Sequence, residues 1–339
     1  MQPLNYAASA ARGLERFLEG GKKELRRLID WGEPVPQDMA RDIFSCERLL
    51  DLLRLPQCEH FQLPEGGHIF NDALKGIKGK PINLPYPLIS VSYRVGADID
   101  GETFDGSKLL YVPKRVAVAI ELPRDKLPYG SQDVFPGCDR ICMIMALFCT
   151  HGEEWKPCMS VALLPTDKWD GTGYEGPTAD LPTFMKEPSG NAFMGKVCIM
   201  LPWHFQAAVR RHGDDYAHRS LYHDIAGEAS AVLELCEALT CSNVSEAVIQ
   251  EVRPRVNIRR AKEGKLPLWQ TKVLTVKVPR RREEKPWQGG HHDTPGYHLC
   301  SGYIRRVPWS NGTENQWIQD YARGDPAKGI IKKTYRITT

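Results

Sequence analysis

Five short apolar segments follow one another between residues 84 and 201, and they constrain the fold more than any other feature. They read "LPYPLISVSYRV", "RVAVAIEL", "DRICMIMALFC", "CMSVALLP" and "KVCIML", with Gly, Pro and Asp residues between them. Branched and aromatic residues in runs of this length, bounded by turn formers, are typical of β-strands. The longest uninterrupted run, Cys142–Cys149, is far shorter than the roughly 18 apolar residues that span a bilayer. The segments therefore predict a sheet, and we expect no membrane partner.

Helical patterns flank this β-rich region. Residues 6–31 and 36–55 carry apolar residues at helical spacing, and Gly20 and Gly21 are expected to interrupt the first helix. From 214 to 240, after an acidic start, apolar residues recur at three- and four-residue steps. We predict an α+β (mixed α/β) fold with an N-terminal helical pair, a central mixed sheet crossed by a long helix, and a basic β-rich C-terminal module.

The start of the long helix holds a group of polar residues, namely Asp214, Asp215, His218, His223 and Asp224. His218 and His223 are five positions apart, so they do not share a helical face. Helix capping and surface solvation explain this group better than metal binding.

Charge divides the chain into two unlike parts. Residues 253–339 hold 19 Lys plus Arg and 7 Asp plus Glu, a balance of +12; subtraction from the totals of 45 and 42 leaves 26 against 35, or −9, for residues 1–252. Such an asymmetry is informative about electrostatic partners. We predict an acidic domain with helices and a mixed sheet over 1–252, and a basic β-rich module over 253–339.

Composition places the chain among ordinary globular proteins, with 42% apolar and 26% charged residues. Most of the ten cysteines lie in apolar runs, which favours reduced, buried thiols. The group Cys138, Cys142, Cys149 and Cys158 lacks the paired short spacing of zinc sites. Charges follow the start of the chain too soon for a signal peptide, so we expect a cytoplasmic protein. No phosphate-binding loop, dinucleotide fingerprint or nucleophile elbow occurs in the sequence, and no cofactor is expected.

The segment from Arg253 to Lys265 is the strongest functional candidate. Six of its thirteen residues are Lys or Arg. In a short helix or turn, such residues neutralise several phosphates at once and release counterions. The candidate phosphate contacts are Arg255, Arg259, Arg260, Lys262 and Lys265. The alternative is a solvated turn in which Asn257 and Gly264 cap a helix.

A second basic segment, "PRRREEKPWQGGHHD", joins Arg280, Arg281 and Arg282 to Trp287. Positive charge beside an aromatic ring suits unpaired nucleotides, because bases stack on the ring. An exposed linker between two strands has the same composition, so both interpretations stand.

Three tracts, "LPYPLISVSYRV", "NIRRAKEGKLPLWQTKVLTV" and the closing "YHLCSGYIRRVPW", continued by "NQWIQDYARGDPAKGIIKKTYRI", resemble a group of bacteriophage and prophage proteins of uncharacterised function. That group has an N-x-x-R-x-x-x-G-K-x-P-L tract before a strand and an H-x-R-R-G-H-x-R-R tract near its end. The first tract corresponds here to Asn257, Arg260, Gly264, Lys265, Pro267 and Leu268, and the second to His298, Gly302, Arg305 and Arg306. The resemblance implies a phage origin and no particular activity.

The chain departs from the second tract in an informative way. Cys300 and Ser301 replace two arginines of the pattern, and Tyr303 replaces its second histidine. A metal-free phosphodiester cleavage site is one candidate here: His298 as acid or base, Tyr303 as proton donor, and Arg305 or Arg306 holding the phosphate. The neighbouring His291, His292 and Asp293 are weak evidence for a metal, and we predict none.

These observations favour a phage accessory protein that acts in the host cytoplasm and binds nucleic acid, or a host nucleic-acid enzyme, through its basic C-terminal module. The first alternative is a metal-independent ribonuclease or toxin-like enzyme. The second is a protein inhibitor whose acidic part covers a host or defence factor.

Overall fold

The computed structural model describes most of the chain, in segments separated by gaps. The described residues are 6–69, 82–95, 114–127, 135, 138–149, 154–166, 196–250, 252–276, 296–300, 303–309, 312–318, 321–323 and 325–330. They include five α-helices: α1 (Tyr6–Asp30), α2 (Gln37–Arg54), α3 (Pro202–His212), α4 (Asp214–Leu239) and α5 (Pro254–Lys262). The predicted helical pair and the predicted long helix are confirmed as α1, α2 and α4.

Eight strands form one mixed sheet in the described part. They are β1 (Glu59–Gln62), β2 (Leu88–Arg94), β3 (Lys114–Pro123), β4 (Arg140–Cys149), β5 (Trp155–Pro165), β6 (Lys196–Ile199), β7 (Val244–Gln250) and β8 (Thr271–Val276). Their order across the sheet is β6-β5-β4-β3-β2-β1-β8-β7. The five predicted segments are β2 to β6, and they pair antiparallel in chain order. β1 is parallel to both of its neighbours, which confirms a mixed sheet in an α+β fold.

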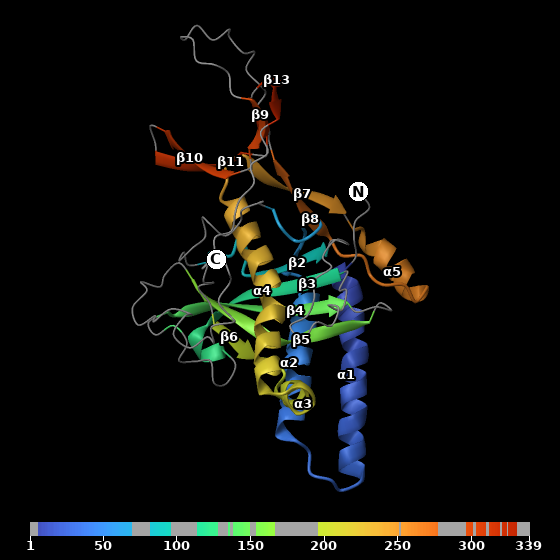
Figure 1. Cartoon of the computed structure of the whole chain (residues 1–339). Coiled ribbons are helices and arrows are strands. Elements are labelled where there is room, and N and C mark those ends of the chain that lie inside the picture. The colour runs from blue at the N-terminus through green and yellow to red at the C-terminus, as the bar shows by residue number, and fades with distance from the viewer. Residues whose placement is uncertain are drawn as a thin grey trace.

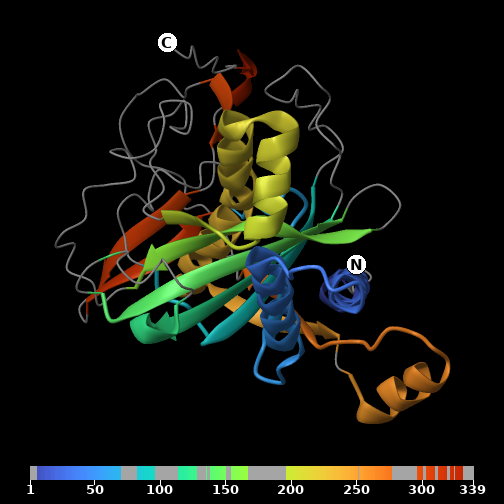
Figure 2. The same cartoon turned by 90° about the horizontal axis from the view of Figure 1, so that it is seen from below.

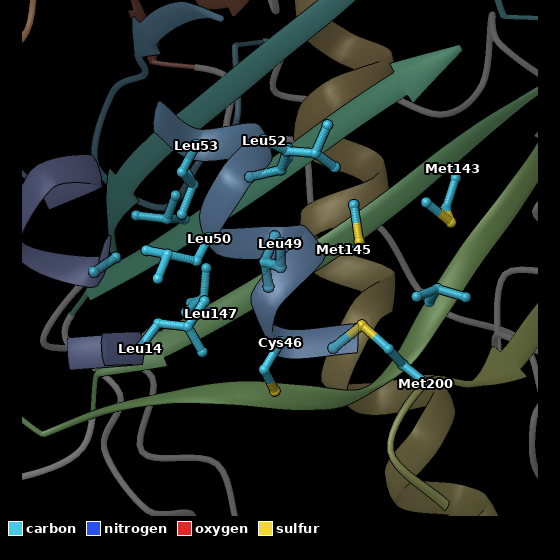
Figure 3. Close-up of a cluster of buried hydrophobic side chains, with 14 of the residues drawn as sticks. Leu14, Cys46, Leu49, Leu50, Leu52, Leu53, Met143, Met145, Leu147 and Met200 are labelled. Atoms are coloured by element: carbon cyan, nitrogen blue, oxygen red, sulfur yellow. The ribbon is translucent and has the colours of Figure 1, made fainter. Parts of the chain in front are cut away.

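The sheet lies between two helical layers. α4 runs across one face, and α1 and α2 cover the other (Figure 1); the view from below shows the sheet between the two layers (Figure 2). Leu14 of α1 and Leu49 of α2 belong to the apolar cluster that includes Leu147 of β4 (Figure 3). On the opposite face, Ile225 of α4 belongs to a second cluster with Ile144. Both faces of the sheet are therefore apolar, which explains why its central strands read as continuous apolar runs.

The basic C-terminal part is built into this sheet. β8 lies between β1 and β7, so the predicted boundary at residues 252 and 253 falls between two paired strands of one sheet. Beyond the sheet, β9 (Gly296–Cys300) pairs with β12 (Tyr321–Arg323) and β13 (Asp325–Ile330), and β10 (Tyr303–Trp309) pairs with β11 (Gly312–Ile318). These strands match the predicted β-rich tail. The residues after 330 lie outside the described part of the chain.

The β10–β11 hairpin is tied to the end of α4. Asn243 accepts a hydrogen bond from the Trp317 amide at 2.8 Å and donates one to the Trp317 carbonyl at 2.7 Å. The Ser242 amide also donates to the Asn315 carbonyl at 2.9 Å. The Asn243 side chain and the Ser242 amide therefore hold the hairpin backbone to the body of the molecule.

The cysteines are buried as predicted. The nine cysteines whose side chains the structure describes are free, and all except Cys198 are buried. Cys138 and Cys149 belong to the core beneath α1 and α2, whereas Cys142 and Cys158 belong to the core beneath α4. Within the described ranges no group of three or more His, Cys, Asp or Glu residues is arranged to hold a metal ion.

α1 runs through Gly20 and Gly21 without the predicted interruption. Each glycine in a helix interior costs about 1 kcal/mol relative to alanine. The buried Leu14 and Leu18 anchor the helix on its core-facing side, and tertiary packing of this kind outweighs weak local propensity. No helix among the residues described is long and apolar enough to cross a bilayer.

Gly13 sets how closely α1 approaches β5. A Cβ atom at this position would lie 2.4 Å from Cβ of Trp155, whose indole Nε1 donates to Ser9 Oγ at 2.9 Å. We expect Gly13→Ala to lower the free energy of unfolding by about 1–3 kcal/mol, because α1 must move off the sheet. Gly20→Ala is the control: its Cβ meets no described atom within 4 Å, so it should raise stability by about 0.5–1 kcal/mol. Urea unfolding measures the change in the free energy of unfolding for each variant. A change of the same sign in both variants would contradict this packing.

Candidate nucleic-acid interface and a buried polar cluster

The predicted phosphate-binding tract folds into α5 and the loop that follows it. Asn257 clamps the loop through two hydrogen bonds of 2.8 Å, one to the Leu268 carbonyl and one from the Leu268 amide. Arg260 Nε donates to the Leu266 carbonyl at 2.6 Å. Gly264 ends the helix with φ of 65°, and the Lys265 amide returns to the Arg260 carbonyl at 2.8 Å. Gly264 ends the helix, as the alternative interpretation expected, whereas Asn257 lies within α5 and, like Arg260, shapes the loop.

The other basic residues of the tract face outward. Arg255, Ile258, Arg259 and Lys262 are all exposed, and their spacing of i, i+3, i+4 and i+7 places them on one side of α5. We call these four residues the outer face of α5. The side chain of Arg259 is 75% exposed, and Ile258 is 58% exposed. α5 itself stands out from the edge of the molecule (Figures 1 and 2).

Two ion pairs accompany the outer face. Glu263 lies 3.7 Å from Arg259 and 2.8 Å from Lys265. All three side chains are exposed, so these pairs contribute at most about 1 kcal/mol each and separate readily when a stronger anion binds. Arg12 of α1 donates to the Gly264 carbonyl at 3.4 Å, which links the loop to the helical pair.

The remaining predicted site residues are placed only in part. Arg280, Arg281, Arg282 and Trp287 lie outside the described residues, as do His291, His292 and Asp293. His298 lies on β9, opposite Arg323 of β12. Tyr303, Arg305 and Arg306 lie on β10, which pairs with β11 in a different small sheet, and Arg305 is exposed. The backbone thus places three of the four candidate catalytic residues on one strand and His298 on another.

One lysine of the basic part is committed to the fold. Lys272 Nζ on β8 lies 2.8 Å from Glu246 of β7, 3.1 Å from Glu59 of β1, and 2.9 Å from the Tyr86 hydroxyl. Its side chain is 11% exposed and also lies over the Tyr86 ring. This residue fastens β8 between its neighbours, so it adds to the basic balance without being available to a partner.

A buried polar cluster beneath α4 was not predicted from the sequence. Arg115 of β3 donates to Glu228 of α4 at 2.7 Å and to the Asp224 carbonyl at 3.4 Å. The side chain of Glu228 is 1% exposed and that of Arg115 is 20% exposed. Tyr93 of β2, also buried, hydrogen-bonds Glu228. The cluster ties α4 to two central strands of the sheet.

Glu234, a second buried carboxylate of α4, binds the loop that follows β1. His68 Nδ1 lies 2.9 Å from the buried Glu234 carboxylate, and the Ile69 amide donates to the same carboxylate at 2.5 Å. The hydrogen bond to Glu234 raises the pKa of His68. Gly67, with φ of 76°, lets the loop pass directly over the Tyr93 ring. The loop after β1 is thus held against α4.

A signal for this cluster does exist in the sequence. Asp224, Glu228 and Glu234 lie next to buried apolar residues of α4, such as Ile225 and Leu235. Acidic residues on the apolar side of a helix must find buried partners, because an unpaired buried charge is very costly. Surface solvation describes Asp224 only in part, because this residue is half-buried and its backbone carbonyl accepts a hydrogen bond from Arg115.

Asp224 titrates near neutrality. Burial raises its pKa to about 7, against the lowering effect of Arg115 and with a further rise from Glu228. A raised pKa means that the protonated carboxyl stabilises the fold at low pH, and that this contribution is lost as the pH rises through about 7.

We therefore expect Asp224→Asn to become progressively more stable than the parent as the pH rises from about 4 to about 7. The difference should reach roughly 3–4 kcal/mol, at about 1.4 kcal/mol for each pH unit. Urea unfolding across this pH range measures it. Asp215→Asn, on the exposed first turn of the same helix, is the matched control. A difference between Asp224→Asn and the parent that stays constant with pH would contradict the assignment.

Comparison with protein-family models, with curated proteins and with solved structures finds no match to the chain. The functional proposal therefore rests on the geometry of α5.

Proposed function

We propose that the chain is a phage accessory protein that acts in the host cytoplasm and binds nucleic acid through the outer face of α5. The phage origin rests on the resemblance of the C-terminal tracts. The binding function rests on one observation: three cationic side chains and one aliphatic side chain are exposed together on a helix that stands out from the sheet.

The shape of α5 suits the groove of a duplex. The helix has nine residues, and an α-helix with its side chains is about 10–12 Å across. The major groove of DNA is about 12 Å wide and admits one α-helix. Arg255, Arg259 and Lys262 would then meet phosphates, and Ile258 would contact base edges such as the thymine methyl group. The bidentate Asn257 clamp holds the helix in position before binding, which reduces the entropic cost of association.

A partly apolar basic face also suits an acidic protein surface, so the test includes that outcome. The purified protein is titrated into labelled duplex DNA, duplex RNA and single-stranded RNA in the presence of a metal chelator, and binding is followed by fluorescence anisotropy. We expect saturable binding to a duplex, weakening steeply as salt rises from about 50 to about 200 mM, with the nucleic acid intact afterwards. Shortened RNA would support the ribonuclease instead. Absence of binding to all three probes would overturn the proposal and favour a protein partner.

A further inference from the structure

A cleft of about 380 Å³ opens where α1, α2 and α3 meet. Its walls are mostly apolar and come from all three helices: Phe17 and Leu18 of α1, Met39 and Ile43 of α2, and Trp203 of α3. A volume of several hundred Å³ with apolar and aromatic walls is typical of small-molecule sites. The cleft is separate from the outer face of α5 and has no part in the proposed function.

A rigid polar pair forms part of the cleft lining. Asp42 of α2 accepts hydrogen bonds from the backbone amides of Trp203 and His204, at 3.2 and 3.1 Å, and its Oδ2 lies 2.6 Å from His204 Nδ1. The side chain of Asp42 is 3% exposed. The Phe17 ring lies against the His204 ring, with 5.2 Å between the centroids. These contacts fix α3 on α2 and hold the aromatic side of the cleft in one arrangement.

Two glycines of α1 form another part of the lining, and packing requires neither of them. A Cβ atom on Gly20 would meet no described atom within 4 Å, and one on Gly21 would meet Ile43 at 3.4 Å, an ordinary contact. Each glycine nevertheless costs the helix about 1 kcal/mol relative to alanine. Because glycine has no side chain, these two positions leave open space in the cleft.

The rim of the cleft is cationic. Arg16 belongs to its lining, and the Arg210 guanidinium lies over the Trp203 ring, 5.5 Å from the ring centroid. Both arginines are exposed. Among the described lining residues the single acid is Asp42, whose oxygens are already bonded to Trp203 and His204. An anionic group would therefore be attracted to the mouth of the cleft and not repelled from its interior.

We propose that this cleft binds a planar aromatic molecule that carries one anionic group, with the ring between Phe17 and Trp203 and the anion paired with Arg16. Two classes of molecule share this chemistry, namely nucleoside monophosphates and aromatic carboxylates. The aromatic walls supply stacking and apolar burial, and the guanidinium supplies a charge-assisted hydrogen bond.

The test uses the full chain and isothermal titration calorimetry with three probes: adenosine monophosphate, 2-naphthoate and the neutral 2-naphthol. We expect one of the two anions to bind with a stoichiometry of one, and the preferred anion identifies the class of ligand. Arg16→Gln should weaken its binding by about tenfold, the effect of losing one charge-assisted hydrogen bond. Gly20→Leu, which fills the cleft, should abolish the binding.

Arg26→Gln is the matched control for charge, because Arg26 is exposed on α1 and is not part of the cleft lining, so it should leave the affinity within about twofold. Thermal unfolding of each variant confirms that the fold is retained. Failure of both anions to bind would overturn the proposal. So would binding of 2-naphthol as tight as that of 2-naphthoate, or binding of the anion that survives Gly20→Leu in a folded variant.

Discussion

Arg115→Met is expected to lower the free energy of unfolding by about 3–5 kcal/mol, because it leaves the Glu228 carboxylate buried without its cation. Methionine replaces the aliphatic stem of the side chain with an apolar chain that adapts to gaps, so most of the loss comes from the missing charge. Burial already raises the pKa of Glu228, and Arg115 is the largest opposing influence. Urea unfolding of the single variant at neutral pH gives the value.

The double variant Arg115→Met, Glu228→Leu separates the charge from the packing. Removing both partners of a buried ion pair is often neutral or even stabilising, so the double variant should recover most of the stability that the single variant loses. If the double variant is as unstable as Arg115→Met alone, the cluster stabilises the fold through the packing of its side chains and not through its ion pair.

The second large effect concerns binding. Changing Arg255, Arg259 and Lys262 together to Ala should weaken nucleic-acid binding by about a hundredfold or more at 0.1 M salt, because three phosphate contacts and their released counterions are lost. The three side chains are exposed, so the melting temperature should hardly change. The loss should be similar for different sequences, since phosphate contacts position a protein without reading bases.

A matched triple variant on the helical pair controls for net charge. Lys23, Arg26 and Arg48 are also exposed, and their replacement by Ala removes the same formal charge from α1 and α2. This control should keep nearly the affinity of the parent. If both triple variants weaken binding equally, the interaction depends on overall charge and α5 is not the site.

The elements with strong periodicity could be predicted, and the way they assemble could not. β2 to β6 are recognisable in the sequence as apolar runs, and α4 is recognisable as a long amphipathic repeat. These elements show clear patterns because they pack against the core. β1 has four residues and is too short to show a pattern. Its parallel pairing with β8 joins residues more than two hundred positions apart, and neither strand indicates that partner. Charge asymmetry predicted a boundary at residues 252 and 253, and it could not indicate that β7 and β8, on either side of it, pair in one sheet.

In the candidate site, too, the sequence predicted the element but not the contacts that its residues make. The basic tract was correctly recognised as a helix or turn, yet its positive residues divide into two roles that composition does not distinguish. Arg260 holds the loop carbonyl of Leu266, whereas Arg259 faces outward. Which of these arginines faces the loop depends on the path of the loop along α5. The two hydrogen bonds between Asn257 and Leu268 fix that path.

The salt dependence of binding, compared between the parent and the Arg255, Arg259 and Lys262 triple variant, tests the central claim most directly. Each phosphate contact contributes about 0.9 to the slope of log affinity against log salt concentration for duplex DNA. If the outer face of α5 meets the phosphates, the slope of the variant should be shallower by about 2 to 3. An unchanged slope would show that the contacts lie elsewhere and would contradict the assignment of α5 as the nucleic-acid interface.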